Sequence, residues 1–290
     1  MTLSARFEVH RGRLLGLAYR MLGSRADAED MVQDAWLKWT RADRAGVEND
    51  EAFLRTMITR LCLDRLKLEQ VRRQSYIGPW LPEPVVDTDA LSPQTTTEIA
   101  DDLSYALLLT LERLSPLERA AFLLHDVFDR PFSEVATTLE RSEAAVRQLA
   151  ARARKAVRDG RPAYPSAPGK HEELLGAFMT ALHEGDQNRL KALLREDAVY
   201  ISDGGGRRPA ASKPLQGADR IVRLLAGVSR RFDRPEGSRS AVPKLINGST
   251  GLLLYGDGVL ESMITIEVDG DLISAIYFVN NPAKLSHLAH

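Results

Sequence analysis

Hydrophobic residues recur at helical spacing along the first quarter of the chain and predict three consecutive helices over residues 1–74. In the first helix Phe7, Leu14 and Met21 share a face, and Gly23-Ser24 ends it. The second carries its apolar side chains on one side: Ala28, Met31, Val32, Ala35, Trp36 and Trp39. The third begins near Asn49, a plausible cap, and we expect its buried face to carry Phe53, Met57, Leu61 and Leu68.

The helical pattern breaks after residue 74. Residues 78–84 contain three prolines and a glycine, and residues 87–98 are acidic, so residues 75–100 are predicted to be a linker. Residues 101–160 are again helical. A second linker, residues 161–170, contains three more prolines.

The pattern changes again at residue 171. Helices are expected at 172–183, 188–195 and 218–232, and a strand at 198–201. Strands are also expected at 251–255, 259–268 and 272–279, separated by two Gly- and Asp-rich turns. Residues 171–290 are therefore predicted to form a curved antiparallel sheet with helices on one face. The expected fold is two all-α domains followed by an α+β domain.

A helix-turn-helix is predicted within residues 101–160. Ser115, Pro116 and Glu118 are arranged as a capping box with proline in the first turn. A short helix at 132–139, a turn at 140–142 and a helix from Ser142 to about Arg158 follow. The last helix has five basic residues and no acidic one between positions 146 and 158, which favours DNA binding over a merely solvated face.

Composition narrows the class of protein. Hydrophobic residues make up 44% and charged residues 27%, as in soluble globular proteins, and the net charge is −1. There is no predicted signal peptide and no apolar run long enough to span a bilayer. A single cysteine, Cys62, cannot form an internal disulfide and suits a cytoplasmic location, and we expect it to lie in a core.

An acidic stripe lies on the second predicted helix. Asp27, Asp30 and Asp34 are spaced three and four residues apart, so they share one face, with Glu29 and Gln33 beside them. Spacing alone fits a solvated face as well as a basic partner. The stretch from Asp27 to Trp36, however, resembles the signature with which sigma factors bind core RNA polymerase.

Residues 114–119 and the helix after Ser142 resemble the −35-reading region of the same proteins. The chain thereby resembles the extracytoplasmic-function sigma factors. Three short motifs in order, Trp80-Leu81-Pro82-Glu83-Pro84, Asp203-Gly204-Gly205-Gly206-Arg207 and Asn281-Pro282-Ala283-Lys284-Leu285, are similar to those of the SigJ-like subgroup, which carries a fused SnoaL-like domain. The C-terminal α+β domain is then expected to be a cone of the SnoaL/NTF2-like type.

The resemblance implies roles for named residues. Core polymerase would contact Asp27, Glu29, Asp30, Gln33 and Asp34. The −10 promoter element would be bound by the third helix, through Arg60, Asp64, Arg65, Lys67, Arg72 and Arg73, and Asp64 is spaced to pair with Arg60 or Lys67. The −35 element would be bound by Ser142, Glu143, Ala144, Arg147, Gln148, Arg152, Arg154 and Lys155, with Arg147 and Gln148 suited to guanine and adenine.

The resemblance also implies that the SnoaL-like domain regulates the rest of the chain in cis. We expect residues 203–207 to dock near Trp80–Pro84, with Trp80 as an apolar anchor. An enzymatic role would need a titratable group in the cone, and His183, Asp203, Glu261 and Tyr277 are candidates that periodicity does not place inside it.

The predicted function is a sigma factor that directs polymerase to promoters. No cofactor, metal or membrane partner is expected, and a ligand of the cone stays open. Two other classes are weighed: a ligand-responsive DNA-binding regulator that acts without core polymerase, and an enzyme with a DNA-binding appendage. Neither of these two classes needs a contact with polymerase, so both leave the acidic stripe unexplained.

Overall fold

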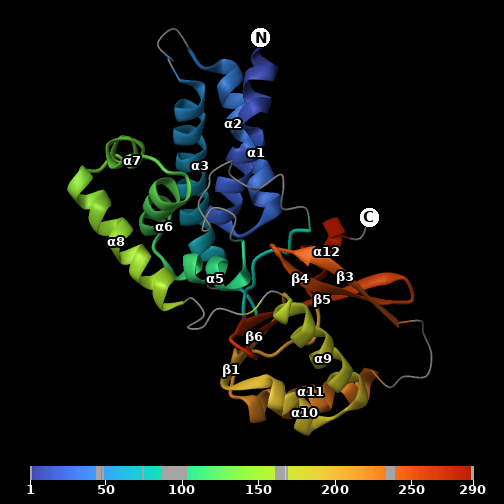
Figure 1. Ribbon diagram of the computed structural model, residues 1–290. Helices are drawn as coiled ribbons and strands as arrows, with labels where there is room; N and C mark the ends of the chain where they lie inside the picture. Colours follow the sequence, from blue (N-terminus) through green and yellow to red (C-terminus); the bar gives the residue numbers. More distant parts are fainter. Residues whose placement is uncertain are drawn as a thin grey trace. The chain divides into compact units, whose positions relative to one another are not determined.

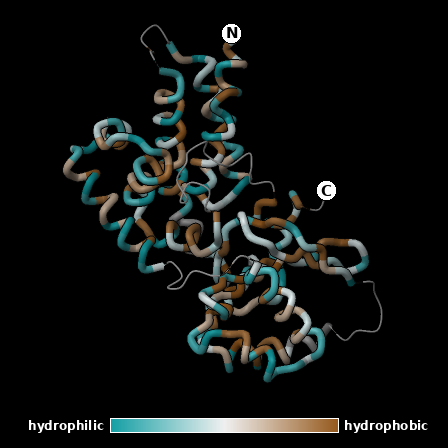
Figure 2. The backbone as a smooth tube through the Cα atoms, viewed as in Figure 1, coloured by the Kyte–Doolittle hydropathy of each residue, from teal (hydrophilic) through white to brown (hydrophobic). Residues whose placement is uncertain are grey.

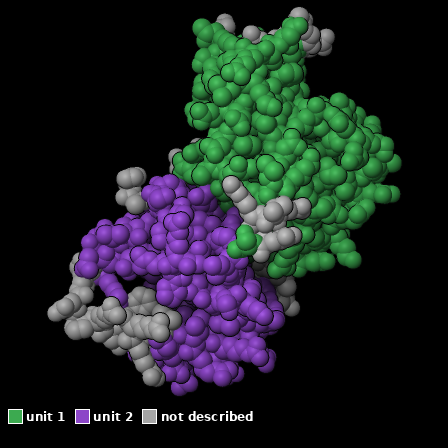
Figure 3. Space-filling model, turned by 180° about the vertical axis from the view of Figure 1, so that it is seen from behind, with its two compact units in different colours: residues 1–75, 87–161 green, residues 76–86, 162–290 purple. Residues whose placement is uncertain are grey.

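The computed structural model describes residues 2–43, 47, 49–73, 75–86, 103–160, 167, 169–232 and 239–288, with the side chains of 70–73 and 228–232 excepted. The chain divides into two compact units (Figure 3). Unit 1 contains Met1–Ser75 and Asp87–Arg161, and unit 2 contains Tyr76–Val86 and Pro162–His290. The first part of the predicted linker, Tyr76–Val86, therefore belongs with the C-terminal domain.

Unit 1 is helical, as expected (Figure 1). Its elements are α1 (Leu3–Leu22), α2 (Arg25–Arg41), α3 (Asp50–Arg73), α5 (Tyr105–Arg113), α6 (Pro116–Phe122), the π-helix η2 (Leu123–Val127), α7 (Phe132–Leu139) and α8 (Glu143–Asp159). Side-chain caps explain several boundaries. Ser24 accepts a hydrogen bond from the Asp27 amide, and Asn49 accepts one from Ala52. Gly23 adopts the left-handed conformation that ends α1, with φ of 68°.

The predicted buried face of α3 is wrong by about one position. Its fully buried apolar side chains are Leu54, Ile58 and Cys62, whereas Leu68 is 68% exposed. The reason is that α3 packs against helices on more than one side, α1 and α2 as well as α6 and α7, so one stripe of apolar residues does not describe it. Cys62 is buried as expected, and burial raises the pKa of its thiol.

Arg119 ties helix α6 to the end of α1. It is only 3% exposed, and its guanidinium donates to the backbone oxygen of Met21 and, at 3.1 Å, to Glu112. Burial lowers the pKa of Arg119 to about 10. Ser115 and Glu118 form the predicted capping box at the start of this helix. Residues 114–119, which resemble a segment of sigma factors, therefore also help to hold α6 against the end of α1.

Unit 2 contains a six-stranded sheet of order β2-β1-β6-β5-β4-β3. The strands are β1 (Leu194–Asp203), β2 (Leu215–Gln216), β3 (Arg239–Ile246), β4 (Ser249–Gly256), β5 (Val259–Asp269) and β6 (Leu272–Val279). The helices α9 (Lys170–Glu184), α10 (Gln187–Leu193) and α11 (Ala218–Phe232) lie together on one face (Figure 1), where Phe178, Ile221 and Ile276 contribute to a buried core. The short helices α12 (Pro282–Leu285) and η3 (Ser286–Leu288) follow β6.

The sheet differs from the prediction in one pairing. β1 and β6 are parallel, and the other neighbours are antiparallel. The long stretch of chain between β1 and β6 allows this crossover, which a tight hairpin does not. Because parallel strands end at the same edge, Asp203 at the end of β1 lies beside Val279 at the end of β6. The Asn280 amide donates to the Asp203 backbone oxygen at 3.0 Å, so the turn after β1 and the segment after β6 are neighbours.

Candidate functional sites

The acidic residues of α2 divide into two groups. Asp30, Gln33 and Asp34 are exposed, and Glu29 is exposed but pairs with Arg25 at 2.9 Å. Asp27 is half-buried and accepts a hydrogen bond from Arg65 of α3. The predicted stripe therefore presents two carboxylates and an amide outward, while its first aspartate ties α2 to α3.

The outer face of α3 carries three of the residues expected at the −10 element. Lys67 pairs with Asp64 at 2.9 Å, and both side chains are 72% exposed. Arg60 pairs with Glu140 at 3.0 Å and donates to the Thr138 backbone oxygen at 3.4 Å. Arg65 instead pairs with Asp27 and Glu69. Burial lowers the pKa of Arg65, but the two carboxylates together outweigh it, and the pKa is raised. The side chains of Arg72 and Arg73 lie outside the described residues.

The helix-turn-helix forms where the sequence predicts it, with α7 and α8 joined by a turn at residues 140–142. Ser142 caps α8 by accepting a hydrogen bond from the Ala145 amide at 3.2 Å. Val146, Ala150, Ala153 and Val157 form its buried face. Figure 2 shows hydrophobic and hydrophilic residues alternating in short bands along α8. One side of the helix is therefore free for polar contacts.

The candidate −35 residues on α8 are not equivalent. Ala144, Gln148 and Lys155 are exposed. Arg147 pairs with Glu143 at 2.9 Å and lies 4.5 Å from the centre of the Phe132 ring. Arg152 pairs with Glu118 at 3.4 Å. Arg147 and Arg152, both exposed and both expected to bind DNA, thus already have acidic partners.

Arg154 is held more firmly than its neighbours. Its Nε donates to Asp126 at 2.6 Å, and its guanidinium lies 5.8 Å from the Phe132 ring. The His125 ring stacks on this Phe132 ring, with 3.7 Å between the two centroids. Asp126, Phe132 and His125 were not predicted from the sequence, because nothing in the local pattern marks them as partners of α8.

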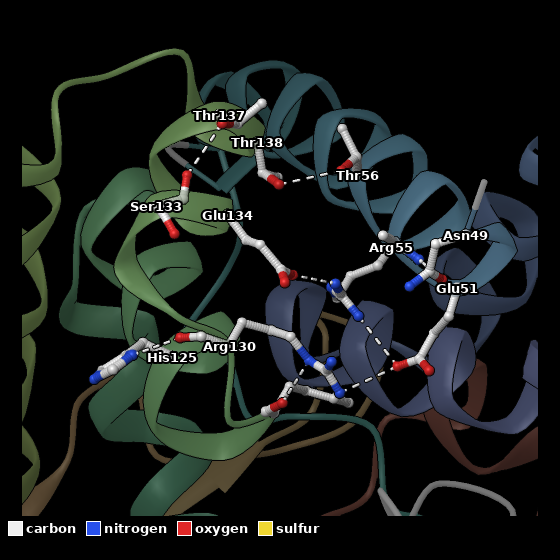
Figure 4. A network of polar contacts seen from close by, with 12 residues as sticks. Asn49, Glu51, Arg55, Thr56, His125, Arg130, Ser133, Glu134, Thr137 and Thr138 are labelled. Carbon is white, nitrogen blue, oxygen red and sulfur yellow. Dashed lines mark hydrogen bonds and ion pairs between the residues drawn. The ribbon is translucent and has the colours of Figure 1, made fainter. Parts of the chain in front are cut away.

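A polar network joins the helix-turn-helix to α3 within unit 1 (Figure 4). Arg55 donates to Glu134 of α7 at 2.8 Å and to Glu51 at 3.1 Å, and Glu51 also accepts from Arg130 at 3.2 Å. The hydroxyls of Thr56 and Thr138 are 3.1 Å apart (Figure 4). Arg55 is 6% exposed, and burial together with the charge of Arg130 lowers its pKa.

A cleft of about 510 Å³ lies next to this network. Arg60, Asp64 and Lys67 of α3 line one side, and residues from the start of α6 and from the turn of the helix-turn-helix line the other. The polar face of α3 therefore lies across the cleft from the start of α6 and the turn of the helix-turn-helix.

In unit 2, Asp203 is the centre of a buried hydrogen-bond cluster. It is fully buried, and its carboxylate accepts four hydrogen bonds. Oδ1 accepts from the Tyr76 hydroxyl at 2.5 Å and the Gly205 amide at 3.0 Å, and Oδ2 accepts from the Leu81 amide at 2.9 Å and Lys284 Nζ at 2.7 Å. One carboxylate thus joins Tyr76–Val86, the turn after β1 and the segment after β6.

Further hydrogen bonds hold the rest of Tyr76–Val86, which is called the held segment from here on. Val85 and Asn247 exchange hydrogen bonds at 2.8 and 3.0 Å, and His287 contacts the Pro84 backbone oxygen at 2.8 Å. Lys284 Nζ also donates to the Leu81 oxygen and lies 4.1 Å from the centre of the Trp80 ring. Residues 81–85, Glu83 included, are buried. Tyr76, Asn247 and His287 belong to none of the three motifs, and the sequence analysis missed them.

Close neighbours explain why two positions in the turn after β1 are glycines. At Gly205, with φ of 58°, a Cβ would lie 2.3 Å from the Asn281 side-chain nitrogen, which donates to the Tyr76 hydroxyl at 3.0 Å. At Gly206, with φ of 70°, it would lie 2.9 Å from Ile77. Residues with a Cβ would be strained at these positive φ values and would press on the side chains of Asn281 and Ile77. Arg207 and Pro282 are exposed, and Leu285 is buried.

The chain matches two family models and several known proteins. Residues 6–72 match sigma-70 region 2, and residues 104–157 match sigma-70 region 4. The extracytoplasmic-function (ECF) RNA polymerase sigma factor SigJ of Mycobacterium tuberculosis is 39% identical over 97% of this chain and 92% of its own length. The chain belongs to the ECF sigma factors. The probable ECF sigma factor SigI of the same species is 30% identical over 99% of the chain and 96% of its own length.

The crystal structure of Mycobacterium tuberculosis SigJ matches 98% of both chains, with a TM-score of 0.76 and 35% identity. The likeness extends through the C-terminal α+β domain, so the expected fold class is confirmed. As a sigma factor, the protein directs RNA polymerase to promoters. Within the described residues, no helix is long and apolar enough to cross a membrane.

Proposed function

We propose that the C-terminal domain regulates this sigma factor in cis by holding the segment Tyr76–Val86. The observation that carries the proposal is the fully buried Asp203 carboxylate, which accepts hydrogen bonds from Tyr76 and Leu81 of that segment. These donors are neutral, and the charged partner of the carboxylate, Lys284, belongs to the C-terminal domain itself. A hydrogen bond to a charged group contributes about 1.5–3 kcal/mol. The segment is thus held by an interaction strong enough to control how often it is released.

Holding the segment restricts the tether between the two DNA-binding regions. A free linker over residues 75–100 would reach roughly 85 Å, against the roughly 50–70 Å between two major-groove sites about 1.5–2 turns apart. When Tyr76–Val86 is held, its own span is fixed, and only the 14 residues from 87 to 100, with a contour length of about 46 Å, can still change the length of the tether. The SnoaL-like domain would thereby limit how far region 4 moves from region 2.

We assign core-polymerase binding chiefly to Asp30, Gln33 and Asp34, with Glu29 beside them. Their exposure supports this role, because an interface needs accessible charges to attract a basic partner. Asp27 would act indirectly, by fixing α2 on α3 through Arg65. Because a sigma factor works with polymerase, we expect this protein to act in the cytoplasm.

For promoter DNA, we assign the −10 element to Arg60, Asp64 and Lys67, with Arg72 and Arg73, and Arg65 as a positioning residue. The −35 element is assigned to α8, with Arg147 and Gln148 at the base edges and Arg152, Arg154 and Lys155 toward phosphates. Arg60 already pairs with Glu140 of the helix-turn-helix turn. Two elements tens of ångströms apart on DNA cannot both be bound while these regions touch, so binding requires them to separate.

The test replaces the buried carboxylate and measures transcription. Purified core polymerase is supplied with the full-length wild type or Asp203→Asn, and promoter-specific output is recorded. Tyr76→Phe removes the hydroxyl that donates to Asp203 and accepts from Asn281, and it leaves the carboxylate in place. Asp271→Asn is the matched control at an exposed turn. We expect several-fold higher output from Asp203→Asn, a smaller rise from Tyr76→Phe and no change from Asp271→Asn.

Equal output from all four proteins would overturn cis regulation while leaving the sigma-factor assignment intact. Transcription without the protein would instead favour a regulator that does not work through polymerase. Melting curves of each variant show whether a changed output comes from unfolding.

A further inference from the structure

The π-helix η2 directs both of its polar side chains toward the helix-turn-helix. π-helices are rare and occur frequently at functional sites. The His125 ring of η2 contacts Phe132 of α7, and the Asp126 carboxylate pairs with Arg154 of α8 at 2.6 Å. This short element is therefore in contact with both helices of the helix-turn-helix.

The Phe132 ring, at the start of α7, is where these contacts meet. His125 stacks on the ring with an interplanar angle of 25°, and His125 Nδ1 donates to the Arg130 backbone oxygen at 2.6 Å (Figure 4). The position of the ring is therefore fixed from the side of η2. The guanidinium of Arg147 lies over the same ring, 4.5 Å from its centroid, and that of Arg154 lies at 5.8 Å. Both distances are within the range of a cation–π contact.

Arg147 contacts both Glu143 and Phe132, and these two partners differ in what they leave available. Glu143 accepts a hydrogen bond from Arg147 at 2.9 Å, and the two side chains are 58% and 48% exposed. An exposed ion pair of this kind is weak, and it occupies an N–H group that guanine would need. Phe132 instead attracts the guanidinium through the face of its ring and accepts none of the N–H···O bonds. Support by the ring is thus compatible with bonding to guanine, whereas the pair with Glu143 competes with it.

We propose that Phe132 is a positioning residue for the reading of the −35 element. Its ring, fixed by His125, holds the Arg147 guanidinium near the start of α8, so less side-chain freedom is lost when a guanine is bound. The proposal rests on the assignment of Arg147 to a base edge. Phe132 then contributes to discrimination at one base pair without bonding a base itself.

Arg154 is the contrasting residue on the same ring. Its Nε donates to Asp126, and it lies farther from the ring than Arg147 does. A carboxylate therefore fixes its direction, and its assigned partner is phosphate, which carries no sequence information. Loss of the Phe132 ring should for this reason change the base preference set by Arg147 more than the affinity for DNA in general.

The test measures base preference with holoenzyme formed from core polymerase and the full-length chain. Selection by the wild type from promoter-length duplexes of random sequence gives the preferred −35 sequence. The position whose preference Arg147→Ala abolishes is then varied on an otherwise fixed duplex. Affinities for the preferred base and its replacements are compared among the wild type, Phe132→Leu and Phe132→Tyr, which keeps the ring. Phe53→Leu is the matched control, because Phe53 is a half-buried aromatic residue of unit 1 that contacts Trp39 instead.

We expect the wild type, Phe132→Tyr and Phe53→Leu to prefer the selected base at least about tenfold. Phe132→Leu should reduce that preference about two- to fivefold and leave the preferences at the other −35 positions unchanged. Adding Phe132→Leu to Arg147→Ala should change no preference further, because the ring then has no guanidinium to hold at a base edge.

An unchanged preference in Phe132→Leu, or an equal loss of affinity for every duplex, would overturn the positioning role. Equal loss of preference in Phe132→Leu and Phe132→Tyr would also overturn it, because the second variant keeps the ring. If Arg147→Ala abolishes no preference, the base-edge assignment fails and the positioning role fails with it. Cis regulation by the C-terminal domain is judged separately, by the transcription assay on Asp203→Asn.

Reduced folding does not imitate the expected result. Base preference is a ratio of two affinities measured on one preparation, so a smaller folded fraction cancels. If Phe132→Leu yields no folded protein, His125→Leu takes its place, since it keeps the ring and removes the side chain stacked on it. The same selective loss of preference is expected, and an unchanged preference in His125→Leu would then overturn the proposal.

Discussion

At the scale of single residues, the chain uses similar charged groups in opposite ways. Asp203 is fully buried and surrounded by donors, while Asp30 and Asp34 are exposed. Asp27 lies between these extremes because Arg65 from another helix reaches it. Identical side chains therefore differ in role through their partners, and those partners come from distant parts of the sequence.

The Tyr76 hydroxyl makes the held segment sensitive to alkaline pH. Burial and then the neighbouring Asp203 raise the pKa of Tyr76 above its ordinary value of about 10. A raised folded-state pKa contributes stability that is complete below the unfolded pKa and is lost as pH rises toward the folded one. Tyr76→Phe removes both the hydrogen bond to Asp203 and the hydroxyl that titrates. The lost hydrogen bond is worth about 1–2 kcal/mol, because it joins a partly exposed group to a carboxylate.

We therefore expect the wild type to melt above Tyr76→Phe by a constant margin from pH 7 to about 9. The margin should narrow once pH passes about 10, because ionisation then favours the unfolded chain. Melting of both proteins across this range measures it. A margin that stays constant to pH 11 would show that Tyr76 is not held by Asp203 in solution.

The sequence indicates which charged residues share a helix face but not how they pair. Spacing on α2 puts Asp27, Asp30 and Asp34 on one face, yet it does not reveal that Arg65 of α3 turns toward Asp27. Periodicity likewise left Asp203 unplaced, because β1 and β6 meet only in the folded sheet. Of the other candidates in the cone, His183 is exposed, Tyr277 is buried and Glu261 lines a cavity of unit 2.

At the scale of elements, local chemistry fixed most boundaries in unit 1. Gly23, Asn49 and Ser142 act where caps and stops were predicted, so α1, α3 and α8 begin or end as expected. In unit 2 the prediction missed β3, because Pro243 interrupts its pattern. The structure accommodates this proline because β3 is an edge strand.

The contact between α7 and α3 should resist promoter binding. Glu134→Gln removes the charge that pairs with the buried Arg55 and is expected to weaken this contact by about 1 kcal/mol, since Glu134 is 46% exposed. If the regions must separate to bind both elements, affinity for a promoter with −10 and −35 elements should rise about two- to fivefold. Binding is measured with polymerase holoenzyme at fixed salt.

Glu8→Gln is the matched control, since this exposed acid lies on α1 in the same unit. It should leave promoter affinity unchanged. Lower affinity for Glu134→Gln than for Glu8→Gln would mean that α7 must stay on α3 when DNA binds, which contradicts the separation argument.

At the scale of the whole molecule, the two compact units do not follow the order of the chain. Tyr76–Val86 lies between two parts of unit 1 in sequence but belongs to unit 2 (Figure 3). The sequence signalled a linker there, because prolines and glycine exclude a helix, but composition does not show what a non-helical segment binds. The three short motifs indicated a relation between the segment and the C-terminal domain only through family resemblance.

The assignment of Asp30 and Asp34, here called the α2 ridge, to polymerase binding is testable on the intact protein. The double variant Asp30→Lys/Asp34→Lys reverses two exposed charges, and we expect capture by core polymerase to fall at least about tenfold with an unchanged melting curve. Glu184→Lys/Asp219→Lys makes the same charge change on exposed residues of unit 2 and should bind normally. Equal loss in both double variants would attribute the effect to net charge rather than to the ridge.

The parallel pairing of β1 with β6 has a consequence for biosynthesis. Lys284 and His287, which contact the held segment, are translated more than 120 residues after α8. At about 5–20 residues per second, the ribosome needs roughly 6–25 s to cover that distance. A nascent chain therefore contains both DNA-binding regions before the residues that hold its linker have been made. In each newly made molecule, Tyr76–Val86 lacks these partners until α12 and η3 leave the ribosome.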